Sequence, residues 1–422
     1  MIEKYLGSAW QPVFRDLSGN QLVEKLYQIA VNGGFSVALW RNPQSQARQV
    51  ILDLSRSVKQ QELRFNKSSA GFCFSPFDLS NGLKPYFIEA NLFAYENKCW
   101  FRSQDADVSG DIHCNKLAVE SKLKSGNGKL SPGLWYANPG DKIAFKAPNK
   151  EAYCGLIAKT IAAIQEKNLK KIVISRVLEV ALSNSFNPLR LFNLLCEAYP
   201  NAFVNLLAIP EVGVWIGATP ELLLSLKSYE LTSVALAGTR SISSNNAINS
   251  GWGDKEIVEQ QIVSEFIRDA FRKLEIHNFI EHPTQTVRIG DLLHLQTKFR
   301  LPDISRFPEG SAEALLKALH PTPAICGTPK AEALQFIREN EMHSREYYSG
   351  FLGPVNLYEQ SRLYVNLRCM QLHEKSALLY AGGGITLDSN PEQEWNETEL
   401  KLAALLNFLA PEPSAVPMER SA

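Results

Sequence analysis

Lys171-Ile-Val-Ile-Ser-Arg176 is the stretch that decides the fold of this 422-residue chain. Its β-branched residues predict a strand. The segment before it, Glu151 to Gln165, carries apolar residues at helical spacing, among them Ile157, Ile161 and Ile164. A helix followed directly by an apolar strand is therefore expected near residue 170.

Similar patterns extend outward from this segment in both directions. Short apolar runs bounded by turn residues predict strands, and these are 35–40, 49–53, a pair within 85–101, 203–209, 212–216, 221–225, 231–237, 363–372 and 377–381. Apolar residues at helical spacing predict helices over 255–273, 334–339 and 394–409. Residues 116–149 are rich in Lys, Ser, Gly, Asn and Pro, which indicates a long connection.

The composition is that of a folded protein with no general affinity for polyanions. Hydrophobic residues make up 45% and charged residues 21% of the chain, and a chain of this length can bury a large core. Lys and Arg number 44, as do Asp and Glu, so the net charge is zero. We therefore expect neither a nucleic-acid partner nor an anionic membrane surface as partner.

Two features that the sequence lacks bear on where the protein is located and on the redox state of its cysteines. No stretch approaches the ~20 apolar residues of a membrane span, and the N-terminus has no basic segment followed by an apolar one, so no secretory signal is visible. Seven scattered cysteines include no CxxC pair, which favours neither a zinc site nor a disulfide framework. We expect a cytoplasmic protein with reduced thiols.

Two residues stand where burial would alter their acidity. Glu221 follows Thr219-Pro220 and precedes three leucines, so a desolvated carboxyl there would suit a general acid. Lys171 opens an apolar strand, where a lysine can lose its proton and act as a base. Taken alone, each residue also fits a solvated position, a turn for Glu221 and a strand end for Lys171, and Lys170 beside it strengthens that alternative.

The last predicted helix carries charged residues on one face. Glu394, Glu397 and Lys401 are spaced i, i+3 and i+7, which fits either a site for a hard cation with an anion or a salt-bridged surface. Glu259, within the helix 255–273, is a further carboxylate or a solvated edge. The glycines of Ala381-Gly-Gly-Gly-Ile385 permit close backbone approach. His294 alone is best interpreted as a core histidine.

Together these segments resemble the chorismate-utilising enzymes, which include isochorismate synthase, salicylate synthase, anthranilate synthase component I and aminodeoxychorismate synthase component I. The resemblance covers about residues 150 to 410. The motifs occur in the family's order: Lys171 to Arg176, Gly217 to Leu222, Leu236 to Arg240, Lys255 to Glu259, Leu293 to Thr297, Leu319 to Ala324, Tyr348 to Gly350, Leu367-Arg368, Ala381 to Ile385 and Glu394 to Leu402.

The resemblance implies roles for individual residues. Glu259 and Glu397 match magnesium-binding glutamates, with Glu394 a supporting carboxylate. Lys171 is implied to be the base, and Glu221 the acid. The residues implied to bind substrate are Gly238, Thr239, His320, Ala324, Tyr348, Arg368, Gly382 and Lys401.

Residue choices within the motifs distinguish members of the family. Members that use water as the nucleophile resemble this chain in carrying a lysine where Lys171 stands. The aminodeoxychorismate type carries a nucleophilic lysine where Ala237 stands, and salicylate synthases tend to carry threonine where Ala324 stands. The resemblance therefore implies an isochorismate synthase, a magnesium-dependent isomerase. In it, neutral Lys171 removes a proton from water that attacks C2 of chorismate, and protonated Glu221 assists loss of the C4 hydroxyl.

The resemblance also implies the fold, the domains and the alternatives. We expect an α/β fold of the α+β kind, with large, mostly antiparallel sheets packed together and helices outside. Residues 1–149 would be a less regular part of the same globule, 150–410 the chorismate-binding region and 411–422 a flexible tail. A salicylate synthase, an ammonia-using component I and a non-catalytic binding protein remain alternatives. The menaquinone and siderophore pathways both remain open for the product, and we expect a monomer.

Overall fold

The computed structural model describes residues 10–14, 19–57, 59–65, 69–80, 82–102, 110–124, 148–167, 169–210, 212–241, 251–289 and 292–409. The expected tail 411–422, the greater part of the connection expected at 116–149, and the side chain of Thr239 lie outside this description. The first part of that connection, residues 116–124, belongs to a helix, α3 (Gly110–Lys124). The prediction of a connection is wrong there, because the lysines, leucines, alanine and glutamate of this segment favour a helix.

Within the described residues, eleven strands form the first sheet, and all their pairings are antiparallel. Their order across the sheet is β1 (Trp10–Phe14), β8 (Lys98–Arg102), β7 (Leu92–Tyr95), β3 (Arg48–Asp53), β2 (Ser36–Arg41), β10 (Phe203–Ile209), β11 (Gly213–Thr219), β20 (Cys369–Leu372), β21 (Ser376–Ile385), β9 (Lys171–Ala181) and β17 (Gly327–Thr328).

In the part of the chain that the structure describes, the second sheet has ten strands, and their pairings are again all antiparallel. Nine run in the order β14 (Ile280–Glu281), β16 (Leu292–Leu301), β13 (Glu230–Ser241), β12 (Leu222–Lys227), β19 (Gln360–Val365), β18 (Phe351–Val355), β5 (Gly71–Ser75), β6 (Tyr86–Glu89) and β4 (Lys59–Gln60), while β15 (Gln285–Ile289) pairs with β16. Both sheets thus take strands from before and after residue 150.

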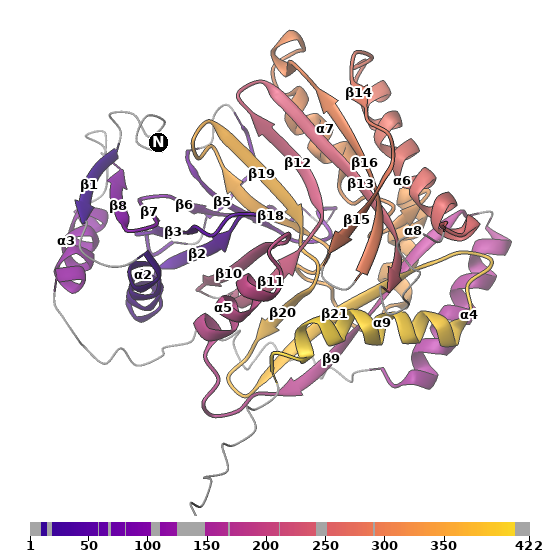
Figure 1. Ribbon diagram of the computed structural model, residues 1–422, viewed down its shortest axis with the longest axis horizontal. Coiled ribbons are helices and arrows are strands. Elements are labelled where there is room, and N and C mark those ends of the chain that lie inside the picture. Colours follow the sequence, from indigo (N-terminus) through magenta and orange to yellow (C-terminus); the bar gives the residue numbers. More distant parts are fainter. Residues whose placement is uncertain are drawn as a thin grey trace, which may run out of the picture.

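The two sheets pack face to face through an aromatic-rich core that includes Trp40, Phe72, Phe203 and Trp215. Helices cover the outer faces (Figure 1). Against the first sheet lie α2 (Gly19–Gly33), α3, α5 (Pro188–Ala198), α9 (Pro391–Leu406), α4 (Lys150–Glu166) and α8 (Lys330–Asn340); against the second lie α6 (Asp254–Lys273) and α7 (Ser311–Leu319). The expected α+β fold of packed antiparallel sheets with outer helices is confirmed. Among the described residues, no helix is long and apolar enough to cross a membrane.

The chain passes between the two sheets at two points that matter for the site. Thr219 ends β11 in the first sheet and Leu222 begins β12 in the second, so Pro220 and Glu221 form the link. Residues 366–368 likewise link β19 to β20. The prediction of one strand over 363–372 is therefore wrong: Arg368 takes a positive φ of 47°, which ends the strand and turns the chain into the other sheet.

Candidate active site

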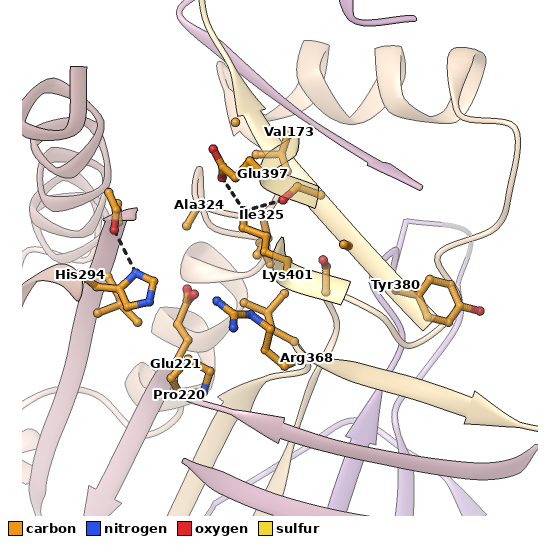
Figure 2. Close-up of a pocket in the computed structure, with 18 of the residues that line it drawn as sticks. Val173, Pro220, Glu221, His294, Ala324, Ile325, Arg368, Tyr380, Glu397 and Lys401 are labelled. Atoms are coloured by element: carbon orange, nitrogen blue, oxygen red, sulfur yellow. Dashed lines mark hydrogen bonds and ion pairs between the residues drawn. The ribbon is translucent and has the colours of Figure 1, made fainter. Parts of the chain in front are cut away.

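A cavity lies where these two links meet, between the ends of the sheets and the helices α6 and α9. Figure 2 shows the Glu221 carboxyl and the Arg368 guanidinium pointing into it, with His294 and Lys401 at its sides. Its lining residues are Val173, Pro220, Glu221, Leu236, Ala237, Gly238, Glu259, His294, Ala324, Ile325, Tyr348, Ser349, Leu367, Arg368, Tyr380, Ala381, Gly382, Gly384, Glu397 and Lys401.

Glu221 is a buried acid facing this cavity. The residue is only 6% exposed. Its backbone is held in place because its carbonyl accepts a hydrogen bond from the Val365 N–H at 2.9 Å. Burial raises the pKa of the carboxyl to about 8, although Lys171 and Lys401 oppose that rise. Glu221 is therefore mostly protonated at neutral pH and can donate a proton.

Cationic and hydroxyl groups converge on the other side of the cavity. The Lys401 ammonium donates to the Gly382 carbonyl at 2.6 Å and pairs with Glu397 at 2.8 Å. Burial lowers the pKa of Arg368, although a guanidinium stays charged at neutral pH. Tyr348 is buried, and its ring stacks on Tyr380 at 5.3 Å between centroids. Arg368 and Lys401 make this side suited to an anion such as a carboxylate.

Lys171 begins β9 and is completely buried, whereas its neighbour Lys170 is exposed. Its amine contacts the Glu259 carboxylate at 2.6 Å. The sequence predicts apolar surroundings for this amine, whereas the structure places a carboxylate against it. Lys171 is not among the cavity's described lining residues and reaches it through Glu259, which lines it.

The three glycines after Ala381 each leave room for a functional side chain. A Cβ on Gly382 would lie 3.1 Å from the Tyr348 hydroxyl, and one on Gly383 would lie 2.8 Å from Glu394 Oε2. A Cβ on Gly384 would lie 2.4 Å from Lys171 Cε and 3.0 Å from Glu259 Oε1. Glycine is required here because β21 runs directly against these side chains.

The three glutamates with implied metal roles come from two helices. Glu259 on α6 and Glu397 on α9 both line the cavity, while Glu394 is buried behind it and accepts hydrogen bonds from Ser389 at 2.7 Å and Lys255 at 3.2 Å. Burial raises the pKa of Glu397, but Lys401, Lys255 and Lys171 outweigh burial and lower it, which keeps Glu397 ionised.

Within the described residues, no group of three His, Cys, Asp or Glu side chains is arranged to hold a metal ion. Two observations nevertheless make these carboxylates suited to a divalent cation. One oxygen of Glu394, Oε2, is buried and has no hydrogen-bond partner in the described part of the chain. Burial and then the Glu397 charge raise the pKa of Glu394, so the two carboxylates repel each other. Magnesium needs only one or two protein carboxylates, and Glu259 and Glu397 face the same cavity.

The structure brings together most residues that the resemblance implies, but not all of them. Gly238, Ala324, Tyr348, Arg368, Gly382 and Lys401 line the cavity with Glu221, Glu259 and Glu397. His320 does not: its ring is buried against Phe351, and Nε2 lies 3.0 Å from the Phe77 carbonyl. Burial lowers the pKa of His320 to about 4, so the neutral ring holds its loop in place rather than facing the cavity.

His294 is the site residue that the sequence analysis assigned to the core. Burial, followed by the charge of Arg368, lowers its pKa to about 4, so the ring is neutral. Its Nδ1 lies 2.9 Å from the Gly238 carbonyl, and because a carbonyl only accepts, Nδ1 carries the proton. His294 thereby fixes the turn at Gly238, whose φ is 69°. The register shift in β13 at this point has no signal in the sequence.

The comparisons with known proteins agree with one another. Residues 110–410 match a family model described as "Chorismate binding enzyme". Isochorismate synthase EntC of Escherichia coli K12 is 28% identical over 266 residues, which span 62% of this chain and 67% of that protein. Isochorismate synthase 2, chloroplastic, of Arabidopsis thaliana is 31% identical over 285 residues, 64% of this chain and 49% of that protein.

Solved structures share the fold over nearly the whole chain. The menaquinone-specific isochorismate synthase MenF of Escherichia coli aligns with a TM-score of 0.75 and 22% identity, covering 91% of each chain. Anthranilate synthase component I of Streptococcus pneumoniae TIGR4 aligns with a TM-score of 0.64 and 17% identity, covering 94% of this chain and 92% of that one. Proteins with different names for their activity thus share this fold, so the fold alone does not identify the reaction.

Proposed function

This chain belongs to the family of chorismate-binding enzymes, and from that premise we propose that it is an isochorismate synthase, converting chorismate to isochorismate. Water adds at C2 of the ring, the ring double bond shifts, and the C4 hydroxyl departs as water. The isochorismate synthases among its relatives support this assignment. The reaction needs an acid for the leaving hydroxyl, a base for the attacking water and cations for two carboxylates.

The observation that carries the proposal is the protonated, buried carboxyl of Glu221 in the same cavity as two cations. With a pKa of about 8, Glu221 can donate a proton to the departing C4 hydroxyl at neutral pH. Arg368 and Lys401 bind the enolpyruvyl carboxylate, and Tyr348 with the backbone at Gly382 completes that side. Ala324 and Gly238 lie against the substrate.

Lys171 is the proposed base for the attacking water. In the described conformation its amine pairs with the Glu259 carboxylate, so it must first pass its proton to solvent by way of Glu259 before it can accept one from the attacking water. Glu259, Glu397 and Glu394 are proposed to hold magnesium, which supplies charge neutralisation and a fixed position for the ring carboxylate.

A product assay tests the proposal directly. The protein is incubated with chorismate and magnesium, and products are separated by chromatography; isochorismate alone is expected. Salicylate with pyruvate would identify a salicylate synthase, and an amino product formed only with ammonia would identify an amination enzyme. Binding without turnover would reduce the chain to a chorismate-binding protein. Each of these three results would contradict the assignment.

The pH dependence of activity is expected to follow the protonation state of Glu221. The acid acts in its protonated form, which exists below its pKa and disappears above it. We therefore expect kcat/KM for chorismate to fall as pH rises through about 8. Initial rates between pH 5 and 10, with circular dichroism to establish that the fold persists, measure this limb. An activity that falls already between pH 5 and 6 would mean that Glu221 has an ordinary carboxyl pKa.

Gly384→Ala is expected to displace the proposed base. The added Cβ meets Lys171 Cε at 2.4 Å, and Lys171 is fully buried, so the amine must shift. A shift of about 1 Å can cost on the order of 10²-fold in turnover, and we expect a loss of that order in kcat. Gly155→Ala is the matched control, because nothing lies within 4 Å of that Cβ. Equal activity of both variants would contradict the placement of Lys171.

A further inference from the structure

Each glutamate of the proposed cation site pairs with a lysine of its own. Glu259 contacts Lys171 at 2.6 Å, Glu397 contacts Lys401 at 2.8 Å, and Glu394 contacts Lys255 at 3.2 Å. The cluster of three glutamates and three lysines is therefore neutral in this conformation. A divalent cation that enters it competes with ammonium groups already in place.

The three lysines differ in how easily they can leave. The side chain of Lys171 is 0% exposed and that of Lys401 is 20% exposed, and Lys401 also donates to the Gly382 carbonyl. The side chain of Lys255 is 42% exposed, and it stands in the first turn of α6, at the outer side of the cluster. Rotating an exposed ammonium group out into solvent costs little free energy. Withdrawing a buried ammonium group costs more, because its buried carboxylate partner is left unpaired.

Lys255 is nevertheless close to all three glutamates. It lies four residues before Glu259 and therefore on the same face of α6, and its partner Glu394 lies three residues before Glu397 on one face of α9. Its positive charge thus lies within reach of every proposed ligand. The partner it holds, Glu394, keeps its other oxygen buried without a hydrogen-bond partner in the described part of the chain, so Glu394 would remain poorly neutralised without a cation.

We propose that Lys255 is the displaceable counter-cation of this cluster: a divalent cation binding among Glu259, Glu394 and Glu397 releases the Lys255 ammonium to solvent. Lys255 therefore sets the cation concentration that the site requires, while Lys171 and Lys401 stay in place for substrate. The inference rests on the proposed function only in taking these glutamates as cation ligands.

Calorimetric titration of the full chain with magnesium alone, without chorismate, tests this. Lys255→Gln removes the competing charge of a half-exposed lysine, and we expect magnesium to bind about three- to tenfold more tightly than to the unaltered protein. Lys255→Arg keeps the charge and should bind as the unaltered protein does. Lys150→Gln is the matched control, since Lys150 pairs with the exposed Glu392 on the same helix α9 rather than with one of the three glutamates.

A second readout is the magnesium-induced rise in Tm, which grows with the ratio of free cation to Kd. It should be larger for Lys255→Gln than for either the unaltered protein or Lys150→Gln. Equal or weaker magnesium binding by Lys255→Gln overturns the inference, as does no binding in any variant. If the affinities shift as expected but chorismate is not converted, the proposed function fails and the role of Lys255 stands.

Discussion

Glu221→Gln is expected to lower kcat for isochorismate formation by about 10²–10⁴-fold, since general acid catalysis contributes effects of this size. Glutamine has nearly the same shape as a protonated glutamic acid but cannot deliver a proton to the C4 hydroxyl. KM for chorismate should change little, because Arg368 and Lys401 hold the substrate's carboxylate. Steady-state kinetics on the purified variant measures both parameters.

Two controls separate the acid from the fold. Glu230→Gln removes a carboxylate from an exposed pair with Arg300 and should leave kcat unchanged. Thermal unfolding measured at several pH values adds a second control, because the direction of the stability change can be predicted. The pKa of Glu221 is raised from 4.5 to about 8 on folding, so its contribution to stability is lost as pH rises through that window. Glu221→Gln should therefore be more stable than the unaltered protein at pH 9, and near-normal turnover by this variant would remove Glu221 from the mechanism.

Lys171→Gln should lower kcat by a factor similar to that expected for Glu221→Gln, about 10²–10⁴-fold. The amide can still donate to Glu259, which preserves the contact to the carboxylate at the cavity wall. It has no amine that can accept a proton from water. The same assay for isochorismate measures the effect, with circular dichroism to establish that the strand β9 is intact.

Two companion variants define what Lys171 supplies. Lys171→Arg keeps the charge but should not restore activity, because a guanidinium does not deprotonate near neutral pH. Lys170→Gln changes the exposed neighbour and should leave turnover as it was. Retention of activity in Lys171→Gln, or its loss in Lys170→Gln, would contradict the assignment of the base.

Apolar residues at helical spacing correctly predict the helices α4 and α6, and a run of β-branched residues correctly predicts the strand β9. The helices α2, α5 and α7 were not predicted, although each is amphipathic. The run 363–372 is equally apolar, yet it is two strands, because Arg368 turns the chain from one sheet into the other. Apolar periodicity reports burial and says little about which sheet a strand joins.

By itself the sequence determined the kinds of chemical groups available and their order: an apolar strand opened by a lysine, a glutamate after Thr-Pro, acidic helices and a run of glycines. Only the tertiary structure decided that Lys171 and not Lys170 is buried, that its amine meets Glu259, 88 positions away, and that His294 rather than His320 faces the cavity. The physical reason is that acidity, charge and access depend on neighbours brought together by packing two sheets, and those neighbours are remote in the chain.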